Sequence, residues 1–92
     1  MDPYKLVPGK LYRVEFAASS PPSPLLMVWK TPLDAVLCGI QAATLRRGDV
    51  ILYREFLVYE GNSLYEIIHP NGIIGFISVG YPWYQLTAQP QQ

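Results

Sequence analysis

Alternation of apolar and polar residues predicts a β-strand near the start of the chain, from Lys10 to Phe16. On one face of this strand lie the apolar residues Tyr12, Val14 and Phe16, and on the other lie Leu11, Arg13 and Glu15. A second apolar run, from Leu25 to Trp29, is short enough to be a buried strand. We therefore expect Tyr12 and Trp29 to belong to the core.

The segment between these strands, from Ala17 to Pro24, is rich in proline and serine. It predicts a long loop, because proline lacks the amide donor that a sheet needs. Its Pro21-Pro22-Ser23-Pro24 sequence has the minimal spacing of a polyproline ligand, so the loop is either a plain connection or a bound element. The residues from Ala35 to Ile40 are compatible with a helical turn, but their β-branched residues and glycine favour a strand.

The second half of the chain alternates between strand and turn signals. A polar turn from Leu45 to Asp49 precedes a long β-branched and aromatic stretch, Val50–Tyr59, in which we expect a bend near Arg54 and Glu55. Turn signals at residues 60–63 and 69–72 separate the further predicted strands, which are Leu64–Ile68, Ile73–Val79 and a short Gln85–Thr87. Strands joined by tight turns form an antiparallel meander.

A chain of 92 residues is long enough for one core. We predict a single domain over residues 1–87 and a polar tail over residues 88–92. Five or six short strands cannot cover both faces of an open sheet, so the pattern favours an all-β fold, a small antiparallel barrel. Gly75, inside a predicted strand, indicates a kink or a close approach of two backbones.

Composition and charge narrow the function. Half of the residues are hydrophobic and 15% are charged, which excludes a disordered chain. Seven basic residues balance seven acidic ones, so we expect no nucleic-acid partner, and no apolar run approaches the length that a membrane requires. Cys38 is the only cysteine and stands in an apolar run; we expect a buried, unreactive side chain and a reducing, cytoplasmic location.

Two stretches of the second half resemble the Src-homology-3-like barrel family. The first, Leu45-Arg46-Arg47-Gly48-Asp49-Val50-Ile51, is similar to the family's Leu-x-x-x-Gly-Asp-x-Ile motif before the second strand. The second, Asn71-Gly72-Ile73-Ile74-Gly75-Phe76-Ile77, is similar to its Gly-x-x-Gly-Phe/Trp-Ile/Val hairpin. The resemblance covers Leu45 to Leu86, about half of the chain, and implies a five- to six-stranded barrel that binds proteins.

The first half departs from the peptide-binding eukaryotic members. It lacks their Ala-Leu-Tyr-Asp-Tyr pattern and the acidic cluster that holds a basic ligand side chain, so their pocket is not carried over. The stretch from Pro8 to Val14 resembles the start of short phage-encoded members. This likeness implies a structural component of a larger assembly, virion-associated if the source is a phage.

The sequence offers few residues that could form a catalytic or a metal site. His69 is the only histidine, in a predicted surface turn, and no Gly-x-Ser-x-Gly elbow or Cys-His pair occurs. One cysteine and one histidine cannot complete a tetrahedral zinc site without clustered carboxylates. We therefore predict no enzyme, no catalytic residue, no metal site and no cofactor.

Four aromatic residues are the candidate partner-binding residues, since Tyr and Trp are typical anchors of protein interfaces. On the barrel interpretation they fall near one strand-to-turn region: Tyr65, Tyr81, Trp83 and Tyr84. Each of them is equally compatible with a place in the core.

Two functions follow from these patterns. One is a structural module that docks by its sheet edges, as a homo-oligomer or within a larger assembly. The other is an adaptor that binds an extended peptide of a partner in an aromatic groove. Cell-wall binding, a third function known in the family, is disfavoured by the lack of an export signal.

Overall fold

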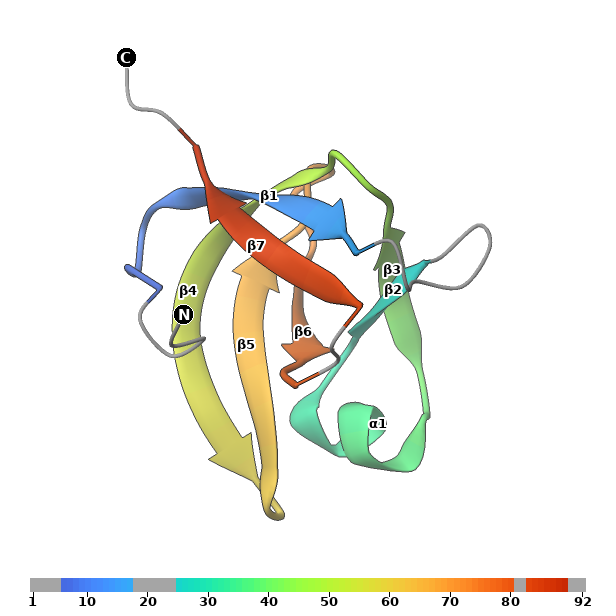
Figure 1. Ribbon diagram of the computed structural model, residues 1–92. Coiled ribbons are helices and arrows are strands. Elements are labelled where there is room, and N and C mark those ends of the chain that lie inside the picture. The colour runs from blue at the N-terminus through green and yellow to red at the C-terminus, as the bar shows by residue number, and fades with distance from the viewer. Residues whose placement is uncertain (1–5, 18–24, 81–82, 90–92) are drawn as a thin grey trace.

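The structure is a computed structural model that describes residues 6–17, 25–80 and 83–89 (Figure 1). These residues form seven strands and one short helix. In chain order they are β1 (Leu11–Phe16), β2 (Leu26–Trp29), α1 (Pro32–Leu37), β3 (Gln41–Leu45), β4 (Val50–Tyr59), β5 (Asn62–Ile68), β6 (Ile74–Ser78) and β7 (Tyr84–Ala88). The predicted Pro-rich loop, apart from Ala17, and Tyr81 lie outside the described residues.

The seven strands form one antiparallel sheet in the order β3-β2-β6-β5-β4-β1-β7. The sheet curls into a half-barrel, with β4 and β5 bent along one side and β1 and β7 crossing above them (Figure 1). The predicted all-β antiparallel architecture is confirmed. The number of described strands exceeds the predicted five or six, and β3 and β7 remain as edges that do not pair with each other.

The predicted meander corresponds to β4, β5 and β6. The expected bend in β4 is confirmed, because the pairing of β4 with β5 shifts register between Tyr53 and Glu55. The strand β5 begins at Asn62, two residues earlier than predicted, since the turn before it needs only Glu60 and Gly61. Both residues adopt positive φ, at 51° and 75°, which closes a tight two-residue connection.

The conformation of the polar turn before β4 is stabilised by the side chain of Asp49. Asp49 Oδ2 accepts a hydrogen bond from the backbone N–H of Arg46 at 2.8 Å. Gly48 has a φ of +90°, and its N–H donates to the carbonyl oxygen of Val14 at 2.8 Å. A residue with a Cβ atom is strained at that angle, so the predicted role of Gly48 in the turn is confirmed.

The buried apolar side chains come from all seven strands and include the predicted Tyr12 and Trp29. Most of them pack into one cluster, and Trp29 and Leu64 are buried outside it. The remaining buried apolar residues are Val14, Leu26, Val28, Leu45, Ile51, Tyr53, Leu64, Tyr65, Ile67, Ile77 and Leu86. Gly75 marks a close approach, as predicted, because a Cβ there would lie 2.4 Å from Val28 Cγ1 and 3.0 Å from the carbonyl oxygen of Trp29.

The predicted strand at Ala35–Ile40 is wrong. Residues Pro32–Leu37 form α1, which connects β2 to β3. Thr31 is its N-cap: the hydroxyl oxygen accepts from the backbone N–H of Asp34 at 3.1 Å, and Pro32 begins the helix without needing a donor. Capping by neighbouring residues outweighs the strand preference of Val36.

The expected burial of Cys38 is also wrong, since its side chain is exposed. Cys38 ends α1 in the left-handed conformation, with a φ of 52°. Its backbone N–H donates to the carbonyl oxygen of Asp34, so the residue turns the chain away from the helix instead of entering the core.

Candidate interaction surface

Three of the four predicted partner-binding residues, Tyr65, Trp83 and Tyr84, lie in the described part of the chain. Tyr65 lies in β5 and is 3% exposed, so it belongs to the core. Its ring makes edge contacts with Tyr53, at a centroid distance of 5.5 Å, and with Phe56, at 6.1 Å. Tyr65 is therefore part of the packing between β4 and β5.

Trp83 and Tyr84 belong to a second aromatic cluster, which also contains Phe16 at the end of β1. The centroid of the Trp83 ring lies 5.5 Å from that of Phe16 and 5.6 Å from that of Tyr84. The Tyr84 hydroxyl donates to the carbonyl oxygen of Ser78 at 2.5 Å. All three rings are half-buried, and they pack against the core at the junction of β1 and β7.

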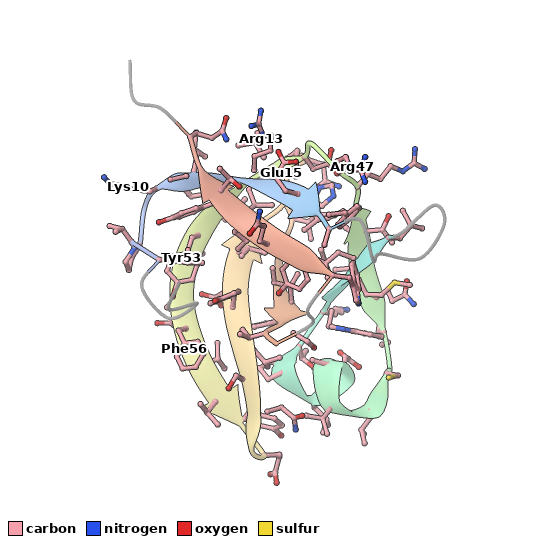
Figure 2. The ribbon with its side chains drawn as sticks, in the orientation of Figure 1. Lys10, Arg13, Glu15, Arg47, Tyr53 and Phe56 are labelled. Carbon is pink, nitrogen blue, oxygen red and sulfur yellow. The ribbon has the colours of Figure 1, made fainter. Side chains whose placement is uncertain are left out.

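One charged side chain lies against this second cluster. The guanidinium of Arg47 lies over the Phe16 ring, 5.9 Å from its centroid, which is within range of a cation–π contact. On the outer face of β1, Arg13 Nε is paired with Glu15 Oε1 at 2.5 Å. Figure 2 shows Arg47 well separated from Tyr53 and Phe56.

Large apolar side chains on α1 and just after it are exposed to solvent. None of its residues is buried. Leu33 is 48% exposed, Leu37 67% and the following Ile40 60%. Leu33 and Leu37 are four residues apart and share a helix face. We call the exposed side chains of Leu33, Leu37, Cys38 and Ile40 the α1 surface.

The backbone beneath the α1 surface is fixed by one carboxylate. Asp34 Oδ2 accepts from the Thr31 hydroxyl at 2.7 Å, and Oδ1 accepts from the backbone N–H of Ile40 at 3.0 Å. These bonds, with the Ile40 N–H contributing most, hold the pKa of Asp34 below its usual value of 3.8. The exposed apolar side chains are thus presented on a closed, hydrogen-bonded unit.

The α1 surface was not found from the sequence, although a signal for it exists. Thr31-Pro32-Leu33-Asp34 has a capping residue, a proline at the first helical position and an acidic residue three places after the cap. That pattern marks the start of a helix. With the helix placed, the spacing of Leu33 and Leu37 follows directly.

The structure gives His69 a structural setting. It lies in the predicted turn, and its ring is part-buried with both nitrogens bonded. Nδ1 accepts from the backbone N–H of Asn71 at 3.1 Å, so the proton sits on Nε2, which donates to the carbonyl oxygen of Thr44 at 2.7 Å. The Nδ1 bond closes the β5–β6 turn, and the Nε2 bond joins that turn to β3.

Groups of three or more potential metal ligands do not occur among residues 6–17, 25–80 and 83–89. In that same part of the chain, the one helix is too short to cross a membrane. Comparison with known proteins gives no match, whether to protein-family models, to curated sequences or to solved structures.

Proposed function

We propose that this chain is a non-catalytic protein-interaction module that docks onto a partner protein through the α1 surface. The observation that carries the proposal is a complete helix without a single buried residue, whose exposed side chains are leucines. A helix gains most of its stability from burying an apolar face, so a surface helix that exposes this face invites a partner.

The rigidity of the unit supports the same proposal. The cap at Thr31 and the bonds of Asp34 order the backbone before any partner arrives. Binding then loses little conformational entropy, which favours affinity for a given contact area. The α1 surface carries no charged side chain, because Leu33, Leu37 and Ile40 are apolar, and it therefore favours an apolar partner surface.

The finer fold assignment is part of the proposal. We infer a Src-homology-3-like barrel, supported by the pairing of β1 with both β4 and the final strand β7. The glycine turn at Gly48 and the β5–β6 hairpin, whose sequences carry the resemblance, also support it. The same resemblance supports a structural role within a larger assembly.

Affinity capture tests the proposal. The tagged protein is incubated with its native lysate beside two variants: Leu33→Ser/Leu37→Ser, which removes the α1 surface, and Val58→Ser. Val58 is a matched control, because it is 60% exposed and lies on the β4–β5 hairpin. Thermal unfolding confirms that each variant is folded.

A partner recovered at fixed stoichiometry by the wild type and Val58→Ser, but not by the α1 variant, supports the proposal. Recovery that is equal for all three proteins contradicts it. A set of assembly proteins among the partners favours the structural role, and a single partner favours an adaptor.

The cluster of Phe16, Trp83 and Tyr84 supports a second candidate function, the aromatic peptide-binding adaptor. Its half-buried rings and the Arg47 guanidinium form a surface that is both aromatic and cationic. In the same capture experiment, Trp83→Ala would lose a partner that the α1 variant retains. Loss in the α1 variant alone excludes this second site.

A further inference from the structure

The two edges of the curled sheet differ in how they are protected. Edge strands carry unpaired N–H and C=O groups that can pair with another strand. On β3, the carbonyl oxygen of Thr44 is covered by His69 Nε2 at 2.7 Å. Neither edge has a described strand beyond it. Among the described residues, β7 shows no side-chain bond of the kind that His69 makes to β3, so its edge is the more open of the two to pairing.

Hydrogen bonds on either side of β7 show which residues face outward. Gln89 N–H donates to Leu11, and Ala17 N–H donates to the carbonyl of Trp83, so residues with odd numbers bond to β1. Opposite residues in an antiparallel pair alternate between bonded and non-bonded positions. Leu86 and Ala88 consequently direct their N–H and C=O groups away from β1, towards solvent.

Apart from its short length, the strand lacks the features that normally prevent edge pairing. Its sequence, Tyr84-Gln85-Leu86-Thr87-Ala88, contains no charge and no proline. Leu86 is buried on the concave face, so Gln85 and Thr87 occupy the outer face. The formal net charge of the chain is zero, which leaves no long-range repulsion between two copies.

We propose that two copies of this chain associate through their β7 edges, antiparallel, around a two-fold axis at Leu86. In this register Leu86 exchanges two N–H···O bonds with Leu86 of the second copy, and Gln85 lies opposite the second copy's Thr87. An antiparallel pair of identical strands satisfies two-fold symmetry.

The charges on the neighbouring strand fit the same arrangement. On β1, Glu15 is paired with Gln85 and Arg13 with Thr87. Across the axis, the row that starts at Glu15 ends at Arg13 of the second copy. Glu15 and the second copy's Arg13 are three strand spacings apart, about 14 Å, so they add little attraction, but no like charges share a row. The register therefore brings no charge repulsion to a second copy of the chain, which favours it as the occupant of the edge.

The contact is small, because only a five-residue strand is added. Interfaces below about 1,000 Å² are weak, so the association should appear only at high protein concentration. Sedimentation from about 20 µM to about 1 mM protein suits an interface of that class. The weight-average mass should rise from 10.4 kDa towards twice that value.

Two charge variants test the register directly. Gln85→Lys/Thr87→Lys places lysines opposite each other in both rows and should weaken association by about tenfold or more. Gln85→Lys/Thr87→Glu places lysine opposite glutamate and should associate within about threefold of the wild type. Ala88→Pro removes an outward N–H without removing an internal bond, and should also weaken association.

A wild type that stays monomeric overturns the proposal. So does association that the double-lysine variant retains, or that the lysine–glutamate variant loses as completely as the double-lysine one. Thermal unfolding of each variant shows that the fold is intact. The Leu33→Ser/Leu37→Ser variant should dimerise like the wild type, so this experiment does not depend on whether α1 binds a partner. Loss of dimerisation in that variant would place self-association on α1 and overturn the β7 arrangement.

Discussion

The imidazole of His69 joins the β5–β6 turn to the far end of the sheet through a 2.7 Å hydrogen bond to the carbonyl oxygen of Thr44. The two residues are 25 positions apart, and two strands, β6 and β2, lie between their own strands in the sheet. Such a contact is possible only because the sheet curls. The hydrogen bond of His69 thus stabilises the half-barrel.

Replacement of His69 should therefore destabilise the fold. His69→Ala removes both ring bonds and leaves the Thr44 carbonyl without its donor, so the free energy of unfolding should fall by about 1–3 kcal/mol. His69→Asn keeps an acceptor for the Asn71 N–H but cannot reach Thr44, and should lose less. Urea unfolding measures both values. Equal stability of His69→Ala and the wild type would show that the ring bonds contribute nothing.

Gly75 should not tolerate a side chain. A Cβ atom in Gly75→Ala would lie 2.4 Å from Val28 Cγ1, inside the fully buried core. Overpacking of this kind typically lowers the free energy of unfolding by about 1–3 kcal/mol. The measurement is urea unfolding, with Ser78→Ala on the same strand as the control.

Shortening Val28 tests whether the clash is the cause. In the Val28→Ala background, Gly75→Ala should be less harmful than in the wild type, with a coupling of about 1 kcal/mol. Additive effects of the two substitutions would place the harm elsewhere.

Acid should loosen the α1 unit. The pKa of Asp34 is lowered by the Ile40 N–H and the Thr31 hydroxyl, so the carboxylate stabilises the folded unit fully above its ordinary pKa of 3.8. That stabilisation is lost as pH falls through the lower, folded-state pKa. NMR titration of the Asp34 carboxyl should give a midpoint below 3.8, accompanied by faster exchange of the Ile40 amide. In Asp34→Asn this acid transition should be absent; a midpoint at or above 3.8 in the wild type contradicts the bonding described.

Strong alkali should act through Tyr53. Burial of its phenol, with Tyr12 and Glu55 nearby, raises its pKa above 10.0. The folded state therefore keeps this proton more tightly, and the associated stability is complete below pH 10 and lost as pH rises through the folded-state pKa. Ultraviolet absorbance of tyrosinate should show a group that titrates above pH 10 in the wild type and is missing in Tyr53→Phe. A titration curve whose part above pH 10 is unchanged by Tyr53→Phe would contradict this burial.

The strands of the meander could be predicted because local signals agree with the fold. Turn residues such as Gly48 and Gly72 adopt positive φ as their positions suggested, and the alternation around Tyr12 matches its burial. β3 was missed, since Gln41-Ala42-Ala43 has little strand preference and owes its conformation to pairing with β2.

The partner-binding site was harder to predict from the sequence, because hydrophobic alternation does not reveal which face of a curled strand is buried. Leu64 and Tyr65 are adjacent in β5 and both are buried, so neither face of that strand is free. The barrel interpretation groups Tyr65 with Trp83 and Tyr84, and in the structure the Tyr65 ring packs in the core against Tyr53 and Phe56. The role of Trp83 and Tyr84 in binding stays a prediction.

The most direct test of docking through α1 uses Cys38, the only cysteine of the chain and an exposed member of the α1 surface. A photoreactive maleimide on Cys38 should crosslink one partner from the native lysate. Excess unlabelled wild type should suppress the adduct, and excess Leu33→Ser/Leu37→Ser should not. A probe at Val58→Cys in a Cys38→Ser background is the control and should give no such adduct. Equal suppression by both competitors, or an equal adduct from both probe positions, would contradict docking through the α1 surface.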